Sequence, residues 1–336
     1  MSACTNLATT VGNIIEFIYL YKTYRRNLPE IKEEISESIN TVPIRIYKII
    51  KEIIRVAIPI SITALIMAIS KNIDSTTIVS ELKDIIGYEE AKKEYGILSG
   101  KVDALINFPL SFNMAIGVAL LPSIASANGN IKSKEKRINE SLLLEMIIAI
   151  PITSIFIMYA DEILKILFPN ATNGAMILKV SSISIIFVTI EQITNNIFHA
   201  IGKTSIPIKA VIVGVIAKAI LNKVLVPRID LPLGGTIGAG LATVICHCIA
   251  SIYSLIMLIK ITNIKISLNN IIKPTFASIV LIAVSKIFYF ILNNKISNKI
   301  IIIISLILGT CAYLVCLKLL NIFNKKDIEL IIKNKK

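Results

Sequence analysis

Four polar side chains recur on one face of a strongly apolar segment near the middle of the sequence. Gln192, Asn195, Asn196 and His199 stand at i, i+3, i+4 and i+7, which places them on a single helical stripe. Glu191 lies beside this stripe, one turn from Asn195. Amide, imidazole and carboxylate groups can hydrogen-bond a polar ligand, and they are costly to bury without a partner. The stripe is therefore a candidate binding surface.

The next apolar segment offers the opposite charge. Lys218 and Asn222 stand at i and i+4 on it, whereas Lys209 and Lys223 lie nearer its ends, where lysines reach toward water. Lys218 and Asn222 are thus candidates for contact with an anionic ligand. The alternative interpretation is structural: Glu191 pairs with one of these lysines, and the amides hold neighbouring helices together.

A second charged group stands at the beginning of another apolar segment. Lys101 and Asp103 could receive a charged substrate at the outer end of this segment, with Asn107 and Pro109 deeper inside it. A charge pair at a helix end is also typical of a simple solvated terminus. Glu145 lies toward one end of its own segment and is interpreted as interfacial.

The sequence carries no motif of enzyme chemistry. The chain has two histidines, and its five cysteines form no C-x-x-C pair and have no histidine or carboxylate at metal-ligand spacing. Phosphate-binding glycine loops and a Ser/His/Asp arrangement are also missing. We expect no catalytic residues, no metal and no cofactor, and the cysteines are interpreted as small packing residues.

Composition places these residues in a membrane. Hydrophobic residues make up 54% of the 336 positions, charged residues make up 17%, and the mean hydropathy is +0.75. Soluble proteins carry about a quarter charged residues. Apolar runs of roughly 20 residues recur, without the alternation of a barrel strand, and that length lets a helix cross a bilayer. The sequence predicts an all-α integral membrane protein.

About nine transmembrane helices are expected. The first is the most polar, and Pro59, Pro109 and Pro151 fall inside spans, where they should kink the helices and free carbonyl groups. The expected spans are 5–22, 53–71, 102–122, 141–159, 175–199, 206–226, 236–259, 272–292 and 300–320.

Loop charges give an orientation. Basic connections belong in the cytoplasm, and the acidic 72–96 and weakly acidic 160–174 loops belong outside. The basic segments are 22–55, 131–137, 260–273 and the tail from Lys318. The N-terminus is then outside and the C-terminus cytoplasmic, and the net charge of +14 needs no nucleic-acid partner. An outside start without a signal peptide favours a chain truncated at its N-terminus.

Several linked motifs resemble one transporter superfamily. They are RVAIPISITALIMAISKNIDSTTIV, LSGKVDALINFPLSF, GVALLPSIASA, QITNNIFHAIGKTSIPIKAVIVGVIAKAILNKVLVP and TIGAGLATVI. Together they look like the stage V sporulation protein B branch of the MOP exporter superfamily, which includes the lipid II flippase MurJ and the MATE antiporters. The resemblance covers roughly residues 50–320.

The resemblance implies a two-lobed transporter of about fourteen helices, of which this chain holds the later part. Residues 1–22 would be the final N-lobe helix and 23–52 a basic cytoplasmic linker. The C-lobe bundle would occupy 53–259, two appended helices 260–320 and a lysine-rich tail 321–336.

The resemblance also implies a substrate, a lipid-linked saccharide or peptidoglycan precursor with an anionic pyrophosphate. The chain would translocate it across the cytoplasmic membrane, for example during spore cortex formation. Lys101 and Lys218 would attract the pyrophosphate, and Gln192, Asn195 and Asn222 would contact sugar or polar backbone. A MATE-like cation antiporter is the alternative, with Glu191 or Asp103 as its exchanging carboxylate and a coupling ion as partner. A non-transporting fragment or scaffold is the third interpretation.

Overall fold

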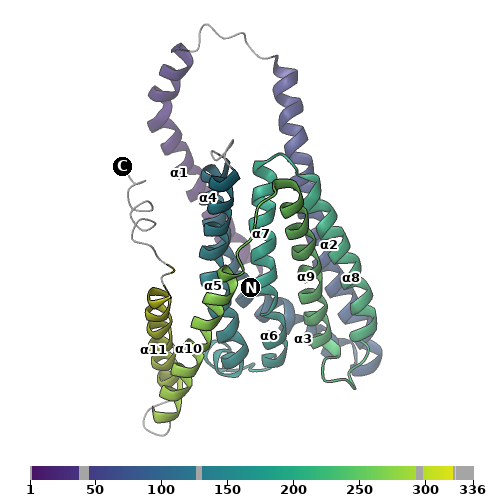
Figure 1. Ribbon diagram of the computed structural model, residues 1–336. Coiled ribbons are helices and arrows are strands. Elements are labelled where there is room, and N and C mark those ends of the chain that lie inside the picture. The colour runs from purple at the N-terminus through teal and green to yellow at the C-terminus, as the bar shows by residue number, and fades with distance from the viewer. Residues whose placement is uncertain (1, 38–44, 126–130, 293–297, 321, 323–336) are drawn as a thin grey trace. The chain divides into compact units, whose positions relative to one another are not determined.

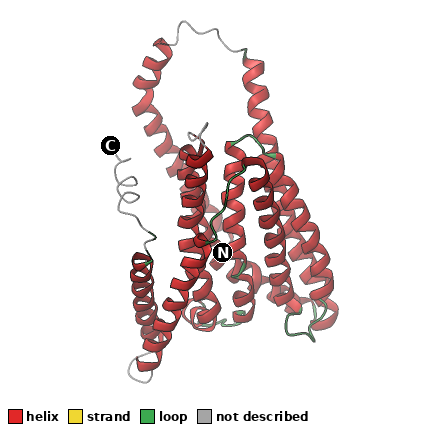
Figure 2. Ribbon diagram, viewed as in Figure 1, coloured by secondary structure: helices red, strands yellow, loops and turns green. Residues whose placement is uncertain are grey.

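The computed structural model describes residues 2–37, 45–125, 131–292, 298–320 and 322 of the chain. Within these ranges the chain is helical, and no β-strand is present (Figure 2). A helix satisfies its own backbone hydrogen bonds, which a bilayer requires because it offers no water to pair with. The all-α fold predicted from composition is confirmed.

The chain divides into two compact units, Met1–Ile54 and Arg55–Lys336. Helix α1 (Ser2–Glu37) belongs to the first unit, and α2 (Ile46–Ile86) crosses the boundary (Figure 1). Helix α1 continues well past residue 22, where its span was expected to end. Its large apolar side chains between Val11 and Tyr21 are exposed, so α1 needs lipid or another apolar surface to cover them.

The second unit is a helical bundle. Helix α9 packs against both α7 and α8, α4 packs against α7 and α5, and the α10–α11 pair packs on α5. The elements that follow α2 are α3 (Tyr88–Ile97), the π-helical turn η2 (Leu98–Val102), α4 (Asp103–Ala125), α5 (Ile131–Leu167), α6 (Ala175–Ser181), α7 (Ser184–Ala200), α8 (Ser205–Leu225), α9 (Gly235–Thr262), α10 (Asn269–Leu292) and α11 (Asn298–Leu319).

The stretch 72–96, which was expected to be a loop, is helical. Helix α2 runs on to Ile86, and α3 begins at Tyr88 after Gly87, whose φ of 88° allows the sharp turn. Ile78 and Leu82 are buried one turn apart in an apolar core. Exposed acidic residues such as Asp84, Glu89 and Glu90 gave this amphipathic stretch the composition of a loop.

Seven helical stretches among the described residues are long and apolar enough to cross a membrane. They comprise α2, α3 with part of α4, α5, α6 with α7, α9, α10 and α11. The expected spans 5–22 and 206–226 correspond to α1 and α8, which are not among the seven. The observed helices therefore agree approximately with the nine expected spans.

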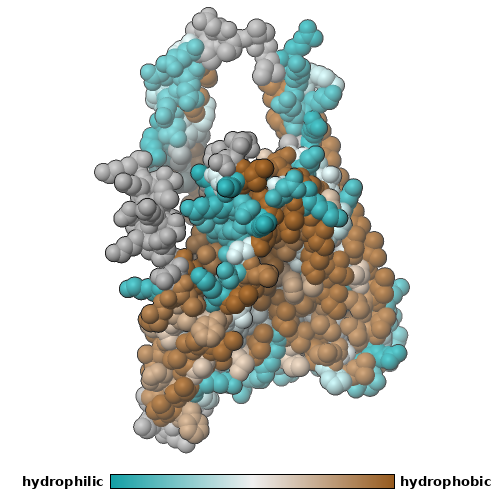
Figure 3. Space-filling model, viewed as in Figure 1, coloured by the Kyte–Doolittle hydropathy of each residue, from teal (hydrophilic) through white to brown (hydrophobic). Residues whose placement is uncertain are grey.

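The surface of the bundle is apolar where a soluble protein would be polar. Ile212, Ile216 and Ile220 form an exposed stripe along α8, and Ile252 and Ile256 are exposed on α9. Figure 3 shows hydrophobic residues covering this face, with hydrophilic residues gathered at its two ends. A continuous apolar surface of this kind is matched by lipid.

The proline in α5 creates a bond between helices. Pro151 has no N–H, so the carbonyl of Ile147 loses its intrahelical donor. The Tyr313 hydroxyl of α11 donates to that carbonyl at 2.7 Å. The break in helical geometry falls instead at Tyr159, with φ −121° and ψ 23°, so the expected kink at Pro151 is displaced by two turns.

Tyr313→Phe should lower the free energy of unfolding by about 1–3 kcal/mol, because it leaves the Ile147 carbonyl without a donor. In a Pro151→Ala background the introduced alanine supplies the helical N–H, and Tyr313→Phe should cost much less. The measurement is thermal unfolding, followed with a thiol-reactive dye, of the wild type, the two single variants and the double variant. These four proteins complete the double-mutant cycle. Equal costs in both backgrounds would contradict the assignment.

Candidate functional site

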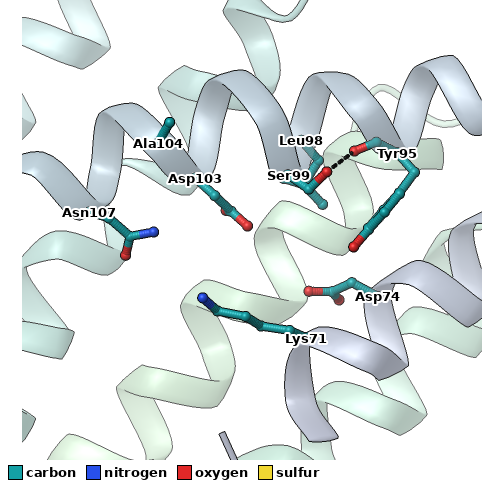
Figure 4. A pocket seen from close by; sticks show the side chains of 8 residues that line it. All are labelled: Lys71, Asp74, Tyr95, Leu98, Ser99, Asp103, Ala104 and Asn107. Carbon is teal, nitrogen blue, oxygen red and sulfur yellow. Dashed lines mark hydrogen bonds between the residues drawn. The ribbon is translucent and has the colours of Figure 1, made fainter. Parts of the chain in front are cut away.

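A polar cavity of about 190 Å³ lies between α2 and the continuous stretch α3–η2–α4 (Figure 4). Figure 4 shows two carboxylates and one ammonium turned into the same space. The lining residues are Lys71, Asp74, Tyr95, Leu98, Ser99, Asp103, Ala104 and Asn107. A cavity with this many charged and polar groups, on helices of membrane-spanning length, is the best candidate for a binding site.

The π-helical turn η2 explains why one helical wall can present so many polar groups. Tyr95, Ser99, Asp103 and Asn107 follow each other at intervals of four, and in an α-helix of 3.6 residues per turn such a series drifts around the axis. A π turn contains more residues per turn and offsets this drift. The Ser99 hydroxyl donates to the Tyr95 carbonyl at 2.9 Å, within this wall.

A buried ion pair links Asp74 of the cavity lining to α8. Lys218 Nζ of α8 lies 2.6 Å from Asp74 Oδ2 and 3.2 Å from Ser70 Oγ. Asn222 Nδ2 donates to Asp74 Oδ1 at 2.9 Å. Lys218 is 2% exposed and Asp74 is 8% exposed. Both carboxylate oxygens of Asp74 are therefore paired, which is what a buried charge requires.

Lys71, like Asp74, lines the cavity but was not among the site residues expected from the sequence. It lies on α2, exposed at the cavity, and its ammonium points toward the side lined by Asp103 and Asn107 (Figure 4). No described residue forms a hydrogen bond or ion pair with it. Its position three residues before Asp74 was a usable signal, because Lys71, Asp74 and the apolar Ile78 fit one continuing helix.

Lys101 and Asp103, which the sequence placed together at a helix end, have different surroundings. Lys101 Nζ donates to the carbonyl of Ala171 at 2.6 Å and lies 3.5 Å from the carbonyl of Asn173, both in the α5–α6 loop. Lys101 is not among the cavity residues, whereas Asp103 is. The backbone carbonyls that follow α5 are good partners for an ammonium.

The polar stripe on α7 lies apart from this cavity. Glu191 bonds His247 Nδ1 of α9 at 2.8 Å, so the partner of Glu191 is a histidine and not the lysine considered from the sequence. Gln192 Oε1, Asn195 Oδ1 and His199 Nδ1 are buried atoms with no partner among the described residues. None of these residues lines the cavity. Of the expected site residues, the structure gathers Asp103, Lys218 and Asn222 around Asp74.

Comparison with known proteins gives a family match. Residues 96–320 match the family described as lipid II flippase MurJ. The uncharacterized membrane protein YabM of Bacillus subtilis (strain 168) is 27% identical over 235 residues, which cover 69% of this chain and 42% of YabM.

Two solved structures show the same fold. The lipid II flippase MurJ in an inward closed conformation superposes with a TM-score of 0.60 at 17% identity, covering 85% of this chain and 58% of that one. A MOP superfamily transporter from Pyrococcus furiosus, described as having a binding pocket of reverse polarity, gives 0.52 at 15% identity over 78% and 62%. The chain spans less than two thirds of the length of each of these three proteins.

The buried pair predicts a specific pattern of stability. Lys218→Met leaves Asp74 charged and buried, and should lower the free energy of unfolding by about 3–5 kcal/mol. Asp74→Asn combined with Lys218→Met removes both charges and should restore most of that loss. Thermal unfolding measures both single variants and the double variant. A double variant as unstable as the sum of the single ones would show that the two residues do not interact.

Proposed function

The chain belongs to the lipid II flippase MurJ family, and from that premise we propose that it moves a lipid-linked saccharide with an anionic pyrophosphate across the cytoplasmic membrane. The family consists of transporters, not enzymes, and the multi-pass helical fold agrees with it. We further propose that the saccharide is part of a peptidoglycan precursor and that the chain acts in spore cortex formation. Both points go beyond what membership of the family implies. The proposed orientation has the N-terminus outside and the C-terminus cytoplasmic.

The unpaired ammonium of Lys71 is the observation that carries this proposal. A pyrophosphate oxygen can accept a charge-assisted hydrogen bond from it at the cavity, while the lipid tail stays in the bilayer. Lys218 uses two of its three N–H groups on Asp74 and Ser70, which leaves one for a ligand that reaches this buried pair. We assign Lys101 to holding the α5–α6 loop, in place of the phosphate contact expected from the sequence.

The saccharide would meet acceptor atoms that have no partner. Asn222 Oδ1, Gln192 Oε1 and Asn195 Oδ1 are buried and unpaired in the part of the chain that is described. Sugar hydroxyl groups are hydrogen-bond donors and would satisfy such oxygens when helices separate. Gln192, Asn195 and Asn222 thus remain the proposed sugar contacts.

A second candidate function is favoured by the two carboxylates in the cavity. Asp103 has no ion-pair partner among the described residues, and Asp74 faces the same space. A MATE-like antiporter needs a carboxylate that exchanges a cation, and Asp103 now fits that role better than Glu191, which is bonded to His247. A coupling cation at Asp103 is also compatible with the flippase.

Lys71→Gln should reduce translocation of a fluorescent lipid-linked saccharide in proteoliposomes by roughly tenfold or more, because it removes a charge-assisted hydrogen bond. Lys93→Gln is the matched control, since Lys93 is exposed, pairs with Glu90 and does not line the cavity. The measurement is protection of the labelled lipid from an external quencher.

The same vesicles, loaded with a cationic dye, separate the alternatives. Dye movement that Asp103→Asn abolishes, with no lipid movement, would replace the flippase with the antiporter. If neither cargo moves, the third interpretation, a non-transporting fragment or scaffold, is favoured. Equal lipid translocation by the Lys71→Gln variant and the wild type would remove Lys71 from the proposal.

A further inference from the structure

Glu145 is a fully buried acid that the proposed transport site does not use. It lies in α5 with a relative exposure of 0%, so its side chain does not reach the surface of the bundle, as an interfacial residue was expected to do. Neither Oε1 nor Oε2 has a hydrogen-bond partner among the described residues. An ionised carboxylate in such a place would cost several kcal/mol, because nothing replaces the water that it loses. The charge of Glu145 must therefore be neutralised while the side chain is buried.

Glu145 faces the junction of α4 and α7. A Cβ atom added to Gly117 of α4 would lie 3.0 Å from Glu145 Oε1 and 2.6 Å from Asn196 Nδ2 of α7. The glycine thus lets three helices meet with a carboxyl and an amide at its surface. One turn earlier on α4, Asn113 donates to Thr189 at 2.9 Å, while its own Oδ1 has no partner among the described atoms.

The unpaired atoms at this junction are acceptors. Glu145 contributes two carboxyl oxygens and Asn113 contributes one amide oxygen, and none of the three has a hydrogen-bond partner within the described part of the chain, although the Asn196 amide lies at the same glycine. A metal ion would need a cavity and several ligands at short distance, yet Glu145 has no accessible surface at all. A proton needs no volume, and it converts one carboxyl oxygen into a donor.

We propose that Glu145 is a proton-binding site, which holds a proton while α4, α5 and α7 are packed together and releases it when they separate. The proposal rests on the junction itself and does not depend on the substrate proposed above. Separation of α4 from α7 admits water to Glu145, where the ionised form is stable. Closure then requires the proton again, so proton binding and helix packing are linked.

Other titratable groups on the neighbouring helices are remote or already bonded. Tyr313 of α11 donates to Ile147, which lies two residues from Glu145 and thus about 200° around α5. On the helices packed against α5, Asp103 is fourteen residues before Gly117, Lys179 pairs with Asp161, Glu191 bonds His247, and Lys273 donates to the Leu320 carbonyl. Lys286 and Tyr289 lie more than three turns beyond Lys273 on α10. On α5 itself Glu140 pairs with Lys136, and Arg137 lies two turns before Glu145.

His199 is the one titratable side chain on α7 that remains. It lies one turn after Asn196, and its Nδ1 has no partner among the described atoms. A neutral imidazole at this place can pass a proton between Glu145 and water when the helices part. His199 therefore belongs in the test as a separate variant.

The first measurement is labelling of the wild-type chain in liposomes with a hydrophobic carbodiimide, which reacts with protonated carboxyl groups, followed by peptide mass spectrometry. We expect an adduct on Glu145 at neutral pH that decreases as the pH is raised, and none on the exposed Glu90. Glu145→Gln should lose the adduct, and His199→Gln should keep it. An adduct on wild-type Glu145 that does not decrease as the pH is raised would overturn the proposal.

The second measurement is the pH dependence of thermal unfolding. The folded chain holds a proton that the unfolded chain releases, so stability should fall as the pH rises. A single such group changes the folding equilibrium constant by up to about tenfold per pH unit. Glu145→Gln, a neutral isostere, should fold without this slope. The same slope in Glu145→Gln and in the wild type would show that another group is responsible.

Discussion

The contact between the carboxylate of Asp74 and the ammonium of Lys218 holds the cavity in its observed form. It joins α2 to α8, and Asn222 and Ser70 complete the hydrogen bonding of both charges. The outward side of α2 is apolar and exposed, as at Leu65 and Ile69, so it gains little from packing within the chain. In a low-dielectric setting, separating Asp74 from Lys218 would leave a buried charge without a partner, which costs much free energy. The pair therefore fixes which side of α2 faces the cavity.

Other buried polar groups follow the same requirement in different ways. Glu191 is hydrogen-bonded to His247, Asn113 donates to Thr189, and the Ile147 carbonyl accepts from Tyr313. Each pair joins two helices, which makes polar groups the specific contacts in a protein whose apolar side chains pack as well against lipid as against each other. Glu145 differs from these groups, because neither of its carboxyl oxygens has a hydrogen-bond partner among the described residues.

The class of protein and most helices followed from the sequence, since long apolar runs admit few other structures. Polar residues in those runs were visible too, but their partners were not. Glu191 and Lys218 looked complementary on adjacent segments, yet each bonds a helix other than the one expected, because contacts in a bundle depend on rotation and depth as well as on order. Asp74 was assigned outside the span ending at residue 71 and Lys71 to its last position, since an amphipathic helical extension has the charge content of a loop.

The π-helical turn η2 separates the cavity-lining residues of the stretch α3–η2–α4 into two groups, one on each side of the turn. Tyr95 and Leu98 lie before or at its start, and Asp103 and Asn107 lie after it. Converting such a turn to regular α-helix rotates one side relative to the other by roughly a quarter of a revolution, without unfolding either. A change of helix type confined to η2 therefore takes the aromatic and hydroxyl groups out of register with the carboxylate and amide, and one helical wall of the cavity loses part of its polar lining while α3 and α4 stay intact.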